Sequence, residues 1–409
     1  MDMKSGMQLK YLMLITFILI TNLFASTVWA VQQPRLSAAV GKQVTIAFAL
    51  YEQGKLPQAL QQLSEIKNRS SFDKAYVNRF IGNLYWELGN EKKALEALKI
   101  ALSEDVLGQT EQRQTQRMLA DLYLNQKQTT QAIALYNELI GYAESESLYQ
   151  QLAMAYYQEK SWQALIEASN KAIALATEFN KSVHILQLSA FYELENYKSA
   201  NKILIKLTEL YPEDKRWWMQ LASTYRLLNE DTKALATYEL AYLNGFVVSS
   251  EEIQYLANFR AVSGSPYQAA LLLESAVNDA VVAKNALVYQ RLASFWQTAR
   301  EHDKAQQYWG ESASLSGNAQ HRLIQAQLLH LLGRYEEMLS VLDTVKSDSS
   351  EIKGKVALTK IQALFELESY AAAMHIARVA LTYPSAQKRA ASWLKILDNK
   401  LKESQQIAA

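Results

Sequence analysis

The sequence predicts an all-α fold in which helical hairpins stack into one right-handed superhelical solenoid that ends in a capping helix. The composition supports this prediction, because Ala, Leu, Gln, Glu and Lys dominate while Gly 13 and Pro 5 are few for 409 residues. Small residues also recur in pairs twelve positions apart. The pairs themselves recur about every 35 residues, about ten times in all.

Residues 216–245 show the repeating unit most clearly. They form two amphipathic stretches around a short polar turn, and large residues of the first face small residues of the second, so that two helix axes can approach closely. The two stripes consist of Trp218, Leu221, Ala222 and Tyr225, and of Ala234, Tyr238 and Ala241. The order Trp-x2-Leu-small-x2-Tyr followed by Ala-x3-aromatic is the pattern of a tetratricopeptide repeat.

The small-residue pairs define the extent of the array. Six pairs are small at both positions: Ala47/Ala59, Gly82/Ala94, Ala120/Ala132, Ala222/Ala234, Ala257/Ala269 and Ala293/Ala305. Three keep the spacing with one larger residue (Leu188/Ala200, Ala326/Met338 and Ile361/Ala373), and Ala153/Ala164 is expected to be one residue short. We therefore expect one array over residues 41–384 with no internal domain boundary, and a capping helix and tail over 385–409, the helix itself spanning Ser385–Lys402.

The first thirty residues have a different character. Lys4 and Lys10 precede an uncharged run, Tyr11–Ala30, that ends in Val-Trp-Ala. This pattern indicates a secretory signal peptide over residues 1–30, followed by a linker over 31–40. The alternative is an uncleaved membrane anchor, since twenty uncharged residues can just span a bilayer. Either case predicts that the folded part lies outside the cytoplasm, in the periplasm.

Composition and motifs exclude several classes of function. The net charge of +1, from 42 basic and 41 acidic residues, gives no electrostatic basis for binding nucleic acid. The chain has no Cys, and its five histidines form no metal-ligand pattern, so we interpret them as solvated or groove-lining residues. Nucleophile elbows and phosphate-binding loops are also absent from the sequence. We therefore expect a non-enzymatic protein without metal or cofactor.

Most aromatic residues fall on the packing stripes, where core packing explains them. These are Tyr85, Tyr123, Tyr136, Tyr156, Tyr225, Tyr238, Trp296 and Trp309. The opposite face of each first helix would line a concave groove, and its Arg, Asn and aromatic side chains are suited to holding an extended peptide or a helix. The candidate partner-binding residues are Arg79, Asn83, Trp86, Arg117, Asp121, Tyr157, Tyr192, Arg226, Asn258 and Gln297, with Gln150, Gln290 and His330 on the same face.

A narrower resemblance lies in the second half of the chain. The segments 211–228, 233–246, 264–274 and 295–316 resemble periplasmic tetratricopeptide-repeat proteins encoded beside TonB, ExbB and ExbD in accessory energy-transducing clusters. This resemblance implies a role in TonB-dependent uptake of iron-siderophore complexes, with TonB, ExbB/ExbD or an outer-membrane receptor as protein partners. It implies contact with the membrane only through those partners, or through an uncleaved anchor.

Two alternatives to this role remain open. The array could be an adaptor in another envelope process, such as assembly of outer-membrane proteins, pili or the cell wall. It could also hold an enzymatic or small-ligand site in its groove, which predicts a compact polar pocket with perturbed carboxylates.

Overall fold

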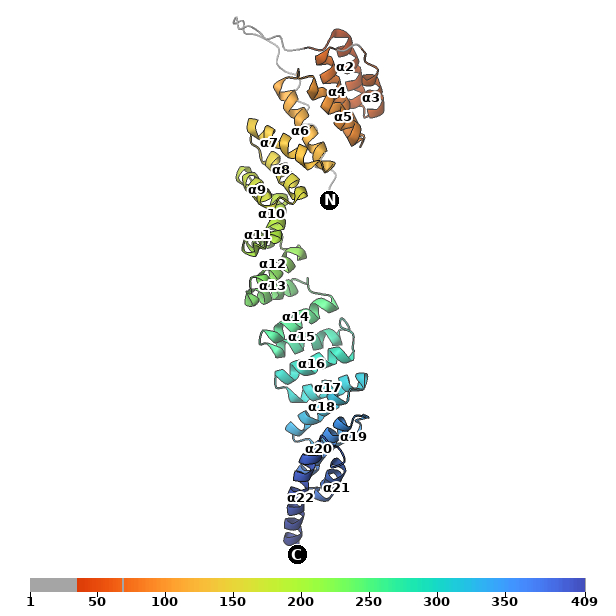
Figure 1. Cartoon of the computed structure of the whole chain (residues 1–409), viewed down its shortest axis with the longest axis vertical. Helices are drawn as coiled ribbons and strands as arrows, with labels where there is room; N and C mark the ends of the chain where they lie inside the picture. The colour runs from red at the N-terminus through yellow and green to blue at the C-terminus, as the bar shows by residue number, and fades with distance from the viewer. Residues whose placement is uncertain (1–34, 68–69, 409) are drawn as a thin grey trace. The chain divides into compact units, whose positions relative to one another are not determined.

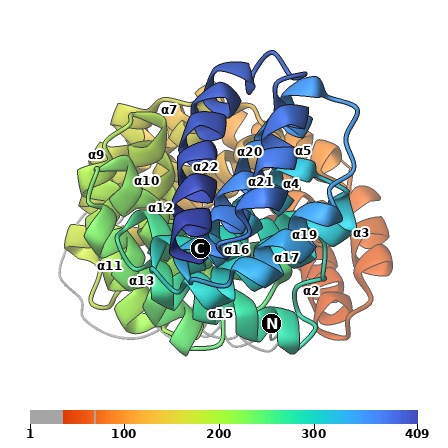
Figure 2. The same cartoon turned by 90° about the horizontal axis from the view of Figure 1, so that it is seen from below.

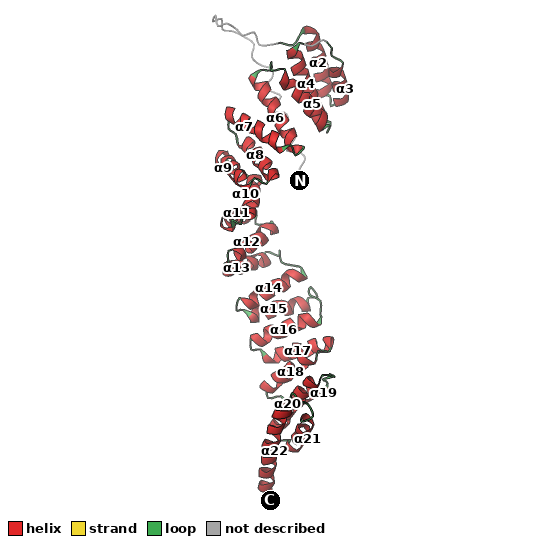
Figure 3. Cartoon of the chain, viewed as in Figure 1, coloured by secondary structure: helices red, strands yellow, loops and turns green. Residues whose placement is uncertain are grey.

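The computed structural model describes residues 35–67 and 70–408, and this part of the chain contains 21 helices and no strand (Figure 1, Figure 3). Twenty of these helices pair into ten consecutive hairpins, and the first helix of each hairpin is here called helix A and the second helix B. The A helices are α2 (Ala38–Glu52), α4 (Ser71–Glu87), α6 (Gln109–Asn125), α8 (Glu146–Glu159), α10 (Lys181–Glu193), α12 (Lys215–Leu227), α14 (Ser250–Val262), α16 (Ala286–Thr298), α18 (Ala319–Leu331) and α20 (Ser350–Glu366). The B helices are α3 (Leu56–Ser64), α5 (Glu91–Ser103), α7 (Thr129–Tyr142), α9 (Trp162–Leu175), α11 (Tyr197–Leu210), α13 (Asp231–Leu243), α15 (Pro266–Asn278), α17 (His302–Ser316), α19 (Tyr335–Asp343) and α21 (Tyr370–Ala380). A single helix, α22 (Gln387–Ala408), follows, so the predicted array of hairpins with a C-terminal helix is confirmed.

The predicted signal peptide, and with it the alternative of a membrane anchor, lies outside the described residues. The first described helix, α2, begins at Ala38, so the last part of the expected linker is already helical.

The packing divides the chain into two compact units, one ending at Ala190 and the other beginning at Phe191, both within α10. In the first unit, one apolar cluster runs from α2 to α5 and another from α5 to α10. In the second unit, apolar clusters run from α13 to α18, from α18 to α20, and from α20 to α22. Each cluster therefore joins neighbouring hairpins, as expected when no single hairpin can bury its own apolar face.

The turn between helix A and helix B is the same in all ten hairpins. Each has a residue with positive φ seven positions after the small residue of helix A, and the next backbone N–H donates to the carbonyl five positions before it, at 2.8–2.9 Å. This bond belongs to the Schellman motif, which ends a helix with a left-handed residue. The ten residues are Gly54, Gly89, Lys127, Lys160, Glu195, Asn229, Gly264, Arg300, Gly333 and Glu368.

The regular turn corrects one part of the predicted register. Ala164 was expected to match Ala153 across a hairpin shortened by one residue, but the structure buries Leu165 fully and leaves Ala164 half-buried. Leu165 lies twelve positions after Ala153, as in every other hairpin. The prediction was wrong because it required a small residue at this position, whereas the space opposite Ala153 accepts a leucine.

Large residues at other small positions are also accommodated. Met338 and Ile361 are both fully buried, in the clusters that join α18 to α20 and α20 to α22. The α22 helix lies beside α20 and α21 and buries Ala390 and Leu397 against them (Figure 2). Trp393 and Leu394, also expected to face inward, pack against the same cluster and are half-buried.

Two glycines of the first unit are expected to respond to alanine in opposite directions. In Gly82→Ala, the new Cβ would lie 2.5 Å from Cδ2 of the fully buried Leu98, so overpacking should cost about 1–3 kcal/mol and exceed the gain of about 1 kcal/mol in helix propensity. Gly141→Ala has open space and should raise the free energy of unfolding by up to about 1 kcal/mol. Urea denaturation of both variants measures this; stabilisation by Gly82→Ala would contradict the packing of α4 on α5.

Candidate binding face

The ten residues predicted for partner binding all lie on A helices, from α4 to α16. None of them is buried: Tyr157, Arg226 and Gln297 are exposed and the other seven are half-buried. The side chains in these positions form what is here called the A-helix face, described separately within each unit.

Polar side chains on this face connect consecutive A helices of the first unit. The Arg79 guanidinium donates from Nη2 to Gln114 Oε1 of α6 at 2.6 Å. Arg117 of α6 then donates from Nη1 to the Ser147 hydroxyl of α8 at 3.1 Å. At the next junction, Asn180 Nδ2, just before α10, donates to Gln150 Oε1 of α8 at 2.9 Å.

The second unit repeats this arrangement. The Tyr192 hydroxyl of α10 is hydrogen-bonded to the Thr224 hydroxyl of α12. Arg226 of α12 donates from Nη1 to the Tyr255 hydroxyl of α14 at 2.7 Å, and Arg291 of α16 donates to Gln254 of α14 at 2.7 Å. Several residues predicted to bind a partner therefore also brace adjacent repeats. The sequence signal for this role is a polar pair separated by about one repeat length.

Other predicted residues contact helix B of their own hairpin. Asp121 Oδ1 accepts a hydrogen bond of 2.6 Å from the hydroxyl of the fully buried Tyr136. Burial raises the pKa of the Asp121 carboxyl above its usual value, although the Tyr136 hydroxyl and Arg117 act in the opposite direction. Gln297 accepts a hydrogen bond of 2.9 Å from Trp309 Nε1.

The remaining four predicted residues lie in different surroundings. Tyr157 is 41% exposed, and its ring meets that of Trp162 edge-on at 5.8 Å. Asn83 Nδ2 lies 3.4 Å from Glu87 Oε1 on its own helix, and Trp86 packs against the cluster from α5 to α10. Asn258 is half-buried on α14.

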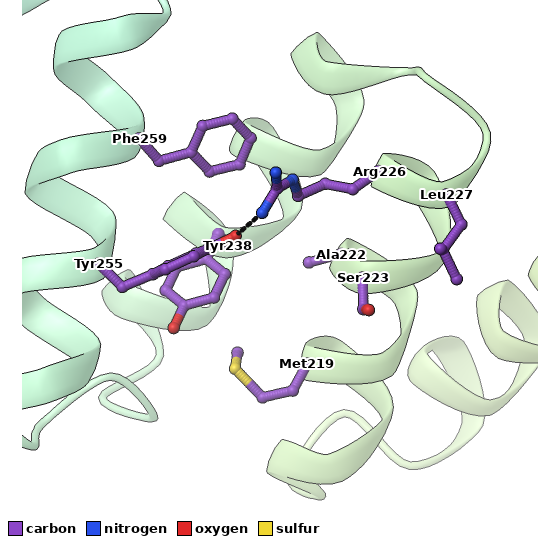
Figure 4. A pocket seen from close by; sticks show the side chains of 8 residues that line it. All are labelled: Met219, Ala222, Ser223, Arg226, Leu227, Tyr238, Tyr255 and Phe259. Atoms are coloured by element: carbon purple, nitrogen blue, oxygen red, sulfur yellow. Dashed lines mark hydrogen bonds between the residues drawn. The ribbon is translucent and has the colours of Figure 1, made fainter.

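A pocket of about 490 Å³ opens on the A-helix face of the second unit, where α12, α13 and α14 meet (Figure 4). We call it the α12–α14 pocket. Figure 4 shows Arg226 extending from α12 to the Tyr255 hydroxyl of α14, beside the Phe259 ring, and Met219 reaching from α12 towards the two tyrosine rings. Its lining residues are Met219, Ala222, Ser223, Arg226, Leu227, Tyr238, Tyr255 and Phe259.

Aromatic rings surround the single cation of this pocket. The Arg226 guanidinium carbon lies 5.5 Å from the centre of the Phe259 ring and 6.0 Å from that of Tyr255, within range of cation–π attraction. The Tyr238 and Tyr255 ring centres are 5.1 Å apart. Burial, with smaller effects from Glu252 and Tyr255, raises the pKa of Tyr238 to about 12, so this hydroxyl stays protonated at neutral pH.

Of the residues that form the pocket, the sequence identified only Arg226 as a binding residue. Tyr238 is predicted to be a core-packing residue, and it does pack against the cluster that runs from α13 to α18, but it is only half-buried and also lines the pocket. Tyr255 and Phe259 lie on α14 outside the positions assigned to the groove. Their spacing of four residues, which places both rings on one helix face, is the signal that would have revealed them.

Two features are not found over the described ranges, a metal-ligand cluster and a membrane-spanning helix. These residues bring no group of three or more His, Asp or Glu side chains together in an arrangement able to hold a metal ion. Within the same ranges, no helix combines the length and apolar character needed to cross a bilayer.

One histidine corrects the expectation that all five are solvated or groove-lining. His321 of α18 is buried, with Nδ1 3.0 Å from the Ser312 hydroxyl and Nε2 3.2 Å from Asn318 Nδ2. Because the Ser312 hydroxyl donates to the Ala286 carbonyl, Nδ1 must donate to Ser312 and Nε2 must accept from Asn318. The network therefore requires a neutral imidazole, and burial lowers the pKa of His321.

This network predicts a loss of stability in acid. The unfolded chain binds a proton on His321 more readily than the folded chain, so the free energy of unfolding should fall as pH drops through about 6.5 towards the folded pKa. His321→Gln should remove this part of the pH dependence, whereas His375→Gln, at an exposed position, should keep it. Urea titrations between pH 8 and pH 5 measure the difference, and identical curves for the wild type and His321→Gln would contradict the network.

Comparison with known proteins gives a family match. Residues 81–147 and 185–245 match the family model described as tetratricopeptide repeat. No curated protein sequence matches the chain.

Several solved structures are also similar to the chain. A tetratricopeptide repeat protein from Parabacteroides merdae is 16% identical over 72% of this chain and 99% of its own, with a TM-score of 0.38. The C-terminal part of a repeat-containing protein from Cytophaga hutchinsonii is 18% identical over 67% and 96%, with a TM-score of 0.41. MamA from Desulfovibrio magneticus RS-1 is 19% identical over 44% and 99%, with a TM-score of 0.39.

These similarities transfer no function to the chain. The family match agrees with the hairpin spacing and with the recurring turn. The chain therefore contains tetratricopeptide repeats.

Proposed function

We propose that this chain is a non-enzymatic scaffold that binds a segment of a partner protein along its A-helix face. Tetratricopeptide repeats generally mediate protein–protein interactions. The observation that carries the proposal is the α12–α14 pocket, where apolar walls and the partly exposed Arg226 open on the same face as the polar side chains that brace the repeats. Such a surface offers an apolar site for a side chain of the partner and, beside it, polar groups that can bind the partner's main chain.

We further propose that the protein works in the periplasm, as an accessory component of a TonB-type system for iron-siderophore uptake. The basic and apolar pattern of residues 1–30 supports export, and the resemblance of segments within 211–316 supports the TonB association. The partner segment would then belong to TonB, to ExbB/ExbD, or to the inward face of an outer-membrane receptor. An adaptor role in assembly of outer-membrane proteins, pili or the cell wall is the alternative.

A deletion strain tests the transport role. It is expected to grow poorly on an iron-siderophore complex as the only iron source, to recover with free iron, and to regain growth when the gene is restored. The tagged protein purified from the restored strain should bring TonB, ExbB or ExbD with it. Normal growth of the deletion strain, together with recovery of proteins from another envelope process, would reject the TonB assignment and favour the adaptor role.

A further inference from the structure

We propose that the α12–α14 pocket anchors one aromatic side chain of the bound segment, and that this side chain is flanked by a carboxylate. The inference rests on the proposed scaffold function, because it names the chemistry of the partner at the same face. It assigns the specificity to Arg226 together with the rings of Tyr238, Tyr255 and Phe259.

The size and the walls of the pocket favour an aromatic occupant. A volume of about 490 Å³ lies in the range of about 300–1,000 Å³ that is usual for ligand pockets, and it has room for one large side chain and the adjoining main chain. Met219, Leu227 and Phe259 supply apolar contacts, while the Tyr238 and Tyr255 rings supply faces and edges against which another ring can pack.

The charge of the pocket favours an anion beside that ring. Arg226 has five N–H donors, and the structure gives one of them to the Tyr255 hydroxyl. Its nearest ion-pair partner is Asp231, whose Oδ1 is 4.0 Å from Nε, and the Arg226 side chain stays 54% exposed. The carboxylate of Glu252, whose charge acts on Tyr238 of the pocket, is already held by Lys215 and by the backbone N–H groups of Val248 and Ser249. A carboxylate of the partner can therefore bind the remaining donors of Arg226.

The position of the pocket favours a peptide segment over a small molecule. On one side the Tyr192–Thr224 contact joins α10 to α12, and on the other the Arg291–Gln254 contact joins α14 to α16. These polar side chains continue the A-helix face of the second unit beyond the pocket in both directions. An extended chain whose side chain fills the pocket can thus make polar contacts on both sides of it.

The junction between α13 and α14, at the pocket, can gain packing contacts when the pocket is filled. The α13 helix packs against α14 less extensively than α15 packs against α16 or α19 against α20. An occupant that touches α12, α13 and α14 together would add contacts across this junction. Binding should therefore raise the unfolding temperature as well as fill the pocket.

The test uses the chain from residue 31 onwards with its methionine methyl groups labelled with ¹³C, because Met219 lines the pocket and the other methionines serve as internal references. The probes are three capped heptapeptides: Gly-Ser-Asp-Phe-Asp-Ser-Gly, the same peptide with Lys in place of both Asp, and the same peptide with Ala in place of Phe. The variants are Arg226→Gln and Ser223→Leu, which places a larger side chain into the pocket from an exposed position. Arg300→Gln removes an exposed charge of the same sign outside the pocket and is the matched control.

We expect the Asp-Phe-Asp peptide to shift the Met219 signal and to bind at least tenfold more tightly than either other peptide. Arg226→Gln should bring the Asp and Lys peptides to within about twofold of each other, Ser223→Leu should abolish the Met219 shift, and Arg300→Gln should change neither. The proposal is overturned if no peptide shifts Met219, if the Ala peptide binds as well as the Phe peptide, or if the preference for Asp survives Arg226→Gln.

Co-purification of the partner distinguishes a wrong pocket assignment from a wrong scaffold function. If the wild-type chain retains its co-purified partner and the Arg226→Gln and Ser223→Leu variants retain it equally, the scaffold stands and the pocket assignment is wrong. If the wild-type chain retains no partner, the scaffold itself is rejected.

Discussion

Trp296→Ala is expected to lower the free energy of unfolding of the second unit by about 3–5 kcal/mol, the range for removal of a large aromatic side chain from a core. Trp296 is fully buried in the cluster that runs from α13 to α18. Its indole meets the Tyr267 ring edge-on at 5.2 Å and lies 3.9 Å from Lys304 Nζ, so one side chain joins α15, α16 and α17. Urea denaturation followed by circular dichroism measures the loss.

Trp296→Phe is the control for this substitution. The structure places no acceptor beside the buried Trp296 Nε1 among the described residues, so phenylalanine loses volume but no hydrogen bond. The loss should be less than half of that for alanine. A loss below about 1 kcal/mol for Trp296→Ala would contradict the packing of these three helices.

Tyr136→Phe is expected to cost about 1.5–3 kcal/mol in the first unit, although it removes a single oxygen atom from a fully buried ring. The lost hydroxyl donates to Asp121 Oδ1, and burial already disfavours that carboxylate. A double-mutant cycle with Asp121→Ala measures the coupling by urea denaturation. Tyr136→Phe should cost much less in the Asp121→Ala background, and equal costs in both backgrounds would contradict the contact.

The pH dependence of this penalty has a definite sign. The folded pKa of Asp121 is raised above its unfolded value, so the folded chain binds a proton more tightly and protonation relieves the cost of burying the charge. Removal of the Tyr136 hydroxyl raises the folded pKa further. The penalty of Tyr136→Phe should therefore be larger at pH 8 than at pH 4.5.

The repeat architecture was predictable because its signal is redundant. Six hairpins have small residues at both positions of the spacing and the other four keep one of the two, so irregular positions do not hide the pattern. The error at Ala164 shows the limit of that signal, because spacing and residue size disagreed there and spacing was correct. The turns show the same limit: only four of the ten left-handed residues are glycine, and Lys160 or Arg300 at such a position is not recognisable from sequence.

The candidate site was less predictable because it depends on contacts between repeats. Arg226 was identified from its place on helix A, but its partners Tyr255 and Phe259 come from the next hairpin. A periodic pattern predicts the helix face on which a residue lies, but it does not predict the side-chain rotamer that contacts the next hairpin. The contacts of Arg79 with Gln114 and of Arg117 with Ser147 were missed for the same reason.

Site-specific photo-crosslinking tests the central claim, that a partner binds along the A-helix face. A photo-reactive residue is placed at Tyr157 of α8 or Gln297 of α16, and in matched controls at the exposed Gln163 of α9 or Gln307 of α17. We expect the same partner protein to be linked at one or both A-helix positions and at neither control. Links only at the B-helix controls, or equally at all four positions, would contradict it.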